Sequence, residues 1–328
     1  MIKPNLFKFA TSELSQDAFI CWLLSWANEE NEIHDKRLCL CARKLLDKFF
    51  EKHNKNKPKK YKRIEIHQQN TGIDILAVVN GEYAILIEDK TGTKNHSEQL
   101  NRYLSEINKR KSFQGNILPI YFKTGDQSDY SDIHKNGYIR FSRQDFLATL
   151  NYGEKLGIEN SIFQDYYTFL QGIENDVNSY NILPVNNWIW KSWTGFFIEL
   201  QKKLEDGGWD YVPNPSRGFM GFWWHSNEGE ECSQYLQLEE SKLCFKIWVG
   251  DPKKYRSFRQ KWHDKIVDES NKHALEVIKP PRFGSGKYMT VAILKGDYRR
   301  KNNSGVLDLE QTIDLLKKVE CILDEAVK

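Results

Sequence analysis

The sequence lacks several features that would place the protein in a special class. Its six cysteines form no Cys-x-x-Cys pair and have no histidine at zinc spacing, which argues against a structural zinc site and favours reduced thiols. The longest strongly apolar stretch, residues 18–26, is less than half of the roughly 20 residues that cross a bilayer. No apolar run follows a basic N-terminal start, and there is no low-complexity tract. We therefore expect a soluble, globular, cytoplasmic protein.

The sequence also lacks a strong charge of one sign, because 48 Lys and Arg residues face 45 Asp and Glu residues and leave a formal charge of +3. A chain so close to neutrality must use local patches for any contact with nucleic acid. One such patch is residues 52–63, where Lys or Arg fills seven of twelve positions and Pro58 interrupts any helix. Two interpretations stay open for this segment. It is either a solvated loop or a flexible loop whose lysines, Lys59 and Lys60 among them, contact phosphates.

The 328 residues, 40% of them hydrophobic, are enough for two domains with cores of their own. Residues 176–187 contain Asn, Ser and Pro184 and are typical of a linker. We therefore expect one domain over residues 1–180 and another over residues 181–328. Eight of the ten tryptophans fall between Trp188 and Trp262, so the second domain is the aromatic-rich one.

Hydrophobic periodicity in the first half predicts an α/β domain. The expected helices cover residues 12–28, 36–51, 96–110, 143–150 and 160–175, and the expected strands cover residues 63–68, 73–79, 83–87, 117–123 and 138–141. The strands at 73–79 and 117–123 are almost continuously apolar, which indicates burial on both faces. Helices should therefore cover both sides of the sheet.

The second half predicts an α+β region, with helices at 188–205, 255–273 and 308–327, a hairpin at 235–249 and a strand at 288–294. Trp190, Trp193 and Phe197 follow helical spacing and are expected in a packing core. An alternative function is open for residues 213–225, which combine Arg217 with Trp223-Trp224 as an aromatic surface for bases. Adjacent residues on a strand face opposite ways, so one of these two tryptophans should lie outside the core.

The segment with chemical potential is the expected hairpin at residues 73–90. Asp74 lies inside an apolar strand, where an unpaired carboxylate is costly. Glu88 and Lys90 are two residues apart at the end of the next strand and share one face. If Asp74 and Glu88 converge, their repulsion favours a cation between them, and oxygen ligands favour Mg²⁺ or Mn²⁺.

The turn at Asn80-Gly81 decides whether this convergence occurs. A strict two-residue turn pairs Val79 with Glu82 and turns Glu88 to the wrong face. A three-residue or five-residue turn, or a bulge, places Asp74 opposite Glu88. We therefore predict a turn or bulge of this second parity, with Gly81 in the left-handed region.

These residues resemble the PD-(D/E)XK nuclease superfamily. Asp74 matches the isolated acid, Glu88-Asp89-Lys90 matches the (D/E)XK element, and Gly72-Ile73 stands where the namesake proline would precede the acid. Upstream, residues 12–17 are similar to the first-helix segment that carries an extra acid, here Glu13. Downstream, residues 99–103 resemble the Gln-x-x-x-Tyr pattern of some branches, with Gln99 and Tyr103.

The resemblance implies a restriction-endonuclease-like mixed β-sheet core flanked by helices, followed by the α+β aromatic-rich C-terminal region. It implies a metal held by Asp74, Glu88 and the backbone carbonyl of Asp89. Lys90 would orient the attacking water or stabilise the transition state, with Glu13 supporting the metal or the lysine. Gln99 would be catalytic, and Tyr103 would position the phosphate backbone together with Lys59, Lys60 and Arg217.

The implied protein is a Mg²⁺-dependent or Mn²⁺-dependent endonuclease that hydrolyses phosphodiester bonds, in DNA rather than RNA. By analogy, its role is defence against phage or foreign DNA. No membrane partner is expected, and a homodimer or a partner protein at the C-terminal region stays open. The alternatives are a non-catalytic nucleic-acid-binding or ligand-sensing protein that keeps the nuclease fold, and a regulatory or toxin-like protein.

Overall fold

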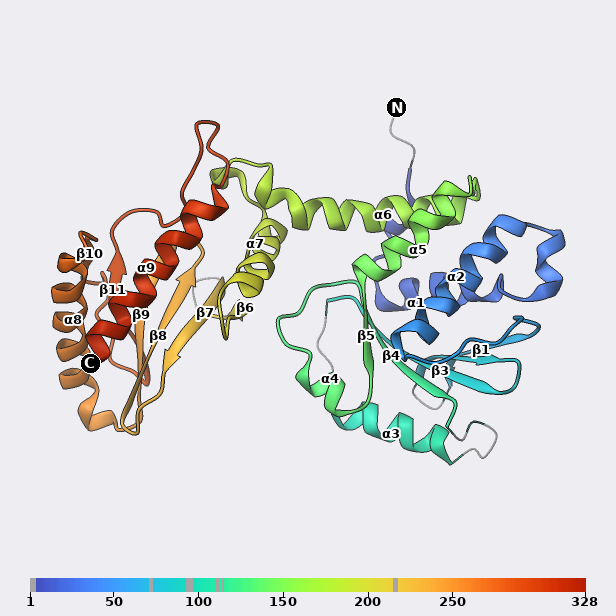
Figure 1. Ribbon diagram of the computed structural model, residues 1–328, viewed down its shortest axis with the longest axis horizontal. Helices are drawn as coiled ribbons and strands as arrows, with labels where there is room; N and C mark the ends of the chain where they lie inside the picture. The colour runs from blue at the N-terminus through green and yellow to red at the C-terminus, as the bar shows by residue number, and fades with distance from the viewer. Residues whose placement is uncertain (1–3, 71–72, 93–96, 110–112, 114, 215–217) are drawn as a thin grey trace. The chain divides into compact units, whose positions relative to one another are not determined.

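The computed structural model describes residues 4–70, 73–92, 97–109, 113, 115–214 and 218–328 (Figure 1). The chain divides into two compact units, Met1–Glu174 and Asn175–Lys328, which we call unit 1 and unit 2. This division falls six residues before the boundary expected at residue 180. The roles assigned to the two domains stay predictions.

Unit 1 contains a five-stranded mixed sheet in the order β1-β2-β3-β4-β5. Its strands are β1 (Ile64–Asn70), β2 (Ile73–Val79), β3 (Tyr83–Lys90), β4 (Ile117–Lys123) and β5 (Ile139–Ser142). The pairs β1-β2 and β2-β3 are antiparallel, whereas β3-β4 and β4-β5 are parallel. The parallel connections pass through helices, as a parallel pair requires.

Helices cover both faces of this sheet, as the apolar strands predict (Figure 1). The helices are α1 (Glu13–Ser25), α2 (Lys36–Lys52), α3 (Ser97–Asn108), α4 (Ser131–Lys135), α5 (Arg143–Lys155) and α6 (Ser161–Asn178), the last of which ends in unit 2. Side chains of α1, α2, α5 and α6 share one core with the strands. Side chains of α3 and α4 pack on the other face.

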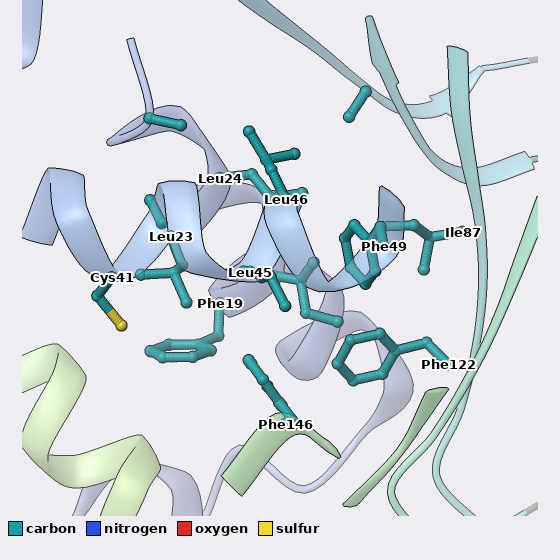
Figure 2. Close-up of a cluster of buried hydrophobic side chains, with 14 of the residues drawn as sticks. Phe19, Leu23, Leu24, Cys41, Leu45, Leu46, Phe49, Ile87, Phe122 and Phe146 are labelled. Carbon is teal, nitrogen blue, oxygen red and sulfur yellow. The ribbon is translucent and has the colours of Figure 1, made fainter. Parts of the chain in front are cut away.

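The larger core of unit 1 is built around aromatic rings (Figure 2). Phe19 of α1 is 2% exposed and stacks on Tyr166 of α6, with ring centroids 3.8 Å apart. Phe122 of β4 contacts Phe146 of α5 edge to face at 4.9 Å. The first helix is thereby fixed against the sheet at the end where its N-terminal residues meet β3.

Unit 2 contains a six-stranded antiparallel sheet in the order β10-β11-β9-β8-β7-β6. Its strands are β6 (Gly208–Val212), β7 (Phe219–Asn227), β8 (Cys232–Glu239), β9 (Lys242–Val249), β10 (Val277–Ile278) and β11 (Tyr288–Leu294). The helices α7 (Trp190–Lys203), α8 (Tyr255–Lys272) and α9 (Leu309–Val327) all bury side chains in a core with one face of this sheet (Figure 1).

The tryptophans of unit 2 are divided between this core and other positions. Trp224 is 1% exposed and lies in the core, whereas its neighbour Trp223 is half-buried on the opposite face. This confirms that one of the two lies outside the core. The expectation for Trp190 was wrong, because Trp190 is 48% exposed. It is the first residue of α7, while Trp193 and Phe197, further along the helix, are buried.

All six cysteines are free thiols, as expected. In the described part of the chain, no helix is long and apolar enough to span a membrane.

Candidate active site

The β2-β3 hairpin has the register that the acidic residues need. Val79 pairs with Tyr83 and Ile75 pairs with Ile87, so the turn has three residues. Asn80 and Gly81 have φ angles of 54° and 73°, in the left-handed region that glycine and asparagine tolerate. The prediction of a turn with an odd number of residues is confirmed. Continuing the same register by one pair beyond Ile75 and Ile87 places Asp74 opposite Glu88.

Three carboxylates surround the ammonium group of Lys90. Its Nζ atom lies 2.8 Å from Glu88 Oε1, 3.5 Å from Asp74 Oδ2 and 3.8 Å from Glu13 Oε2. It also donates a hydrogen bond of 2.8 Å to the backbone carbonyl of Asp89. Asp74 accepts a 2.9 Å bond from the Asp89 backbone N–H, and Glu13 accepts one of 3.1 Å from Thr91. The structure thus brings together five of the predicted residues from α1, β2 and β3.

The carboxylate of Glu88 is unusually placed for a charged group. Its side chain is 1% exposed, and among the described residues neither oxygen accepts a hydrogen bond of good geometry, although Lys90 is close to Oε1. Burial, followed by the charge of Asp74, raises the pKa of Glu88 to about 7, against the opposing effect of Lys90. The carboxylate therefore lacks a sufficient positive partner.

The ammonium of Lys90 is held in its charged form. Burial would lower the pKa of Lys90, but the close contact with the Glu88 carboxylate at 2.8 Å and the charges of Glu88, Asp74 and Glu13 raise it above its ordinary value. A lysine that keeps its proton acts as a hydrogen-bond donor or a fixed positive charge.

The side chain of Asp89 points to the other face of β3, where sequence reasoning missed its partners. Gln16 of α1 donates a 2.5 Å bond to Asp89, and its own oxygen accepts from Thr124 at 2.7 Å and from Tyr166 at 2.9 Å. Burial raises the pKa of nearby Asp17 to about 6. Burial also raises the pKa of Asp89 well above its ordinary value. This buried network ties the backbone that carries the Asp89 carbonyl to α1. Its signal in the sequence was the pair of polar residues, 16 and 17, at the start of an otherwise apolar helix.

A second lysine at the strand ends was also missed. Lys123 pairs with Lys90 across the parallel strands β3 and β4 and is 1% exposed. Burial is the main cause that lowers its pKa to about 8, with Glu13 opposing and Lys90 reinforcing the shift. A charged residue that ends an apolar strand was the available signal.

The remaining predicted residues are not joined to this cluster by any contact that the structure describes. Gln99 and Tyr103 belong to α3, the helix that packs on the sheet face carrying Asp74 and Glu88. The structure does not describe the side chains of these two residues. Lys59 and Lys60 are exposed in the segment between α2 and β1, where Lys60 lies 3.8 Å from Glu29. Arg217 lies outside the described residues. Their assignments stay predictions.

The donor set fits a divalent cation. Carboxylates and a backbone carbonyl are the hard oxygen ligands that Mg²⁺ and Mn²⁺ prefer. The buried oxygens of Glu88 without hydrogen bonds are the clearest indication, because a buried carboxylate normally has partners. With the three acids ionised, the charges of −3 and +1 leave −2 around Lys90. Within the described residues, no group of three or more His, Cys, Asp or Glu is arranged as a formed metal site.

The mixed sheet flanked by helices, with acids and a lysine at the ends of β2 and β3, defines a restriction-endonuclease-like fold. A family model of the PD-(D/E)XK nuclease superfamily matches residues 4–179, more than half of the chain. The chain therefore belongs to this superfamily, which suggests nuclease activity on a nucleic-acid substrate. Nucleases of the superfamily generally use divalent metals. Comparisons with curated proteins and with solved structures found no match.

Proposed function

We propose that the protein is a metal-dependent endonuclease that hydrolyses phosphodiester bonds in DNA, with its active site at the ends of β2 and β3. The observation that carries the proposal is the convergence of three carboxylates on Lys90, which with all three ionised exceed the charge of that lysine by two. Such an excess in a buried setting is stabilised by a divalent cation.

The proposed ligands are Asp74, Glu88 and the carbonyl of Asp89. A cation bound there would polarise the scissile phosphate and lower the pKa of a bound water. Lys90 would donate to the phosphate oxygens as negative charge develops on them. Glu13 would keep the lysine in place, since it lies 3.8 Å from Nζ and accepts from the backbone of Thr91. Gln99 and Tyr103 would position the phosphate backbone from α3.

Several finer points belong to this proposal. Mg²⁺ or Mn²⁺ is favoured by the all-oxygen donor set. DNA as the substrate, a cytoplasmic location and a role in defence against phage or foreign DNA rest on analogy with nucleases of this type that carry appended domains.

One observation favours the alternative of a non-catalytic binding module. Lys90 contacts every proposed ligand, so the chain itself supplies a positive charge that partly neutralises the acids. Such an arrangement would also suit a protein that keeps the nuclease fold and has lost its chemistry.

A cleavage assay distinguishes the two. The full-length protein is incubated with single-stranded DNA, double-stranded DNA and RNA in Mg²⁺, in Mn²⁺ and in EDTA. We expect cleavage of DNA with either metal and none in EDTA. Asp74→Ala should lower the rate by about 100-fold or more, because it removes a metal ligand together with the acceptor for the Asp89 backbone.

Metal binding is measured in parallel through the thermal unfolding midpoint. Mn²⁺ should raise the midpoint of the wild type and leave that of Asp74→Ala almost unchanged, because a ligand that binds the folded state stabilises it. A wild type that gains stability from Mn²⁺ but cuts no substrate would favour the binding module. Cleavage that survives Asp74→Ala would contradict the assigned site.

A further inference from the structure

The sheet of unit 2 carries a line of aromatic residues on the face opposite its helices. The core residues Leu236, Phe245 and Ile247 face α7, α8 and α9, and the residues that alternate with them face the other way. Across three adjacent strands on that other face, Ser233 pairs with Trp248 and Trp248 pairs with Tyr288. Direct cross-strand neighbours have Cβ atoms about 5 Å apart, so these residues lie side by side on that face.

This surface is hollowed into a cavity of about 630 Å³. Four aromatic rings line it, interspersed with polar side chains and one valine: Trp223, Tyr235, Trp248, Tyr288, Ser226, Ser233, Gln237 and Val212. Its volume is in the range of sites that take small ligands or single nucleotides. Tyr288 at its edge is 63% exposed, which is unusual for a large ring on a sheet.

The rings of the cavity differ from those of the core in their partners. In the core, Trp224 lies 5.6 Å from Phe222, and Trp193 lies 4.7 Å from Trp188. Within the described residues, no ring-to-ring contact joins the four cavity rings. Trp223 instead lies against Gly208 of β6, where an added Cβ would come within 2.7 Å of the indole nitrogen. In the part of the chain that the structure describes, the cavity rings therefore lack the ring partners that the core rings have.

Positive charge adjoins the rings. Lys287 places its ammonium 5.2 Å from the Trp248 ring centre, and its carbonyl accepts from the Val249 backbone. The segment 279–287, which leads into β11, contains Lys279, Arg282 and Lys287 and no acid. Arg259 of α8 anchors this segment through a 2.6 Å bond to the Phe283 carbonyl. Lys246 nearby is paired with Glu239 at 3.1 Å, so among the described residues Lys287 is the cation shown beside the rings without an acidic partner.

We propose that this face binds single-stranded nucleic acid, with unpaired bases stacked on the rings of Trp223, Trp248 and Tyr288 and a phosphate directed to Lys287. Every base offers a flat face, and aromatic rings beside cations are the usual means of holding a single strand. The inference extends the proposed function by adding a second contact with the substrate, far in sequence from the cleavage site.

The test measures binding of a fluorescein-labelled 12-residue oligodeoxythymidine to the full-length protein in EDTA, by fluorescence polarisation. We expect Trp248→Ala and Tyr288→Ala each to weaken binding at least fivefold, and Lys287→Ala to weaken it and reduce its salt dependence. Trp248→Phe keeps a ring and should restore most of the affinity. The matched control is Trp190→Ala, which removes a 48% exposed tryptophan from α7.

Two further probes test whether binding needs the bases and whether it needs more than one nucleotide. An abasic oligomer of the same length should bind at least tenfold more weakly than the oligodeoxythymidine, and thymidine monophosphate should bind more weakly than either. Equal affinity for the abasic oligomer, equal affinity for the mononucleotide, or unchanged binding by Trp248→Ala would each overturn the proposal.

A third probe locates the contact independently of affinity. An oligomer with 5-iodouracil should photocrosslink to peptides of β8, β9 or β11 and not to unit 1 alone. Because these measurements involve no cleavage, their failure would leave the proposed nuclease site untouched, and an inactive nuclease would leave them valid.

Discussion

Replacing Lys90 by alanine is expected to lower the rate of metal-dependent cleavage by about 10²–10³-fold, the usual cost of losing one charged donor at a developing negative charge. The raised pKa of Lys90 keeps its ammonium charged across the working pH range, so the wild-type rate should show no decline caused by deprotonation of this lysine. Single-turnover cleavage of DNA in Mn²⁺ measures this rate. The substitution also leaves three carboxylates without their shared cation, so circular dichroism is recorded to confirm the fold.

The matched control for Lys90→Ala is Lys36→Ala. Lys36 is a largely exposed lysine at the start of α2, 3.9 Å from Glu32, and its loss should leave the rate within twofold of the wild type. If Lys90→Ala cleaves within fivefold of the wild-type rate, Lys90 has no role at the transition state and the site must be reassigned.

Phe19→Ala is expected to destabilise unit 1 by about 3–5 kcal/mol, the range for removing a buried phenylalanine. Phe19 is 2% exposed, stacks on Tyr166 and lies within 6.0 Å of Phe146 (Figure 2). Hydrogen exchange followed by mass spectrometry should show α2 peptides exchanging about 100-fold faster or more, since a factor of ten corresponds to about 1.4 kcal/mol. Exchange resolved by peptide is needed because two units need not unfold together.

Phe9→Ala serves as the comparison for Phe19→Ala. Phe9 is 84% exposed, so its removal should change the exchange of α2 by less than threefold. If Phe19→Ala also changes exchange by less than threefold, the ring stack contributes little and the core is held elsewhere.

Local sequence was a sound guide wherever the pattern was strong. The strands 73–79, 117–123 and 288–294 have the predicted residues or nearly so, because their apolar runs end at charged residues or turns. The turn at Asn80-Gly81 was also predictable, since only one parity lets Asp74 and Glu88 share a face. Strands β6 and β7 could not be delimited, because glycines and a proline-rich segment obscure their alternation.

The sequence predicted which residues form the candidate site. It did not predict all of the contacts that hold them in place. Order along the chain and the resemblance to a nuclease superfamily gave Glu13, Asp74, Glu88 and Lys90, and the three acids all lie against the lysine. The bond between Gln16 and Asp89 joins residues 73 apart in sequence, and no periodicity encodes such a pairing. Burial of Lys123 was equally hidden, because its exposure depends on helices packed from elsewhere in the chain.

By itself, the sequence determined that acids and a lysine meet at the end of a hairpin, because side-chain alternation and turn length fix the face on which each residue lies. It also determined that eight of the ten tryptophans belong to a second unit. The tertiary structure alone decided which of those rings were buried. Three helices cover one face of the unit 2 sheet and leave Trp223, Trp248 and Tyr288 on the other, and a ring is apolar enough for either face until the packing around it is known.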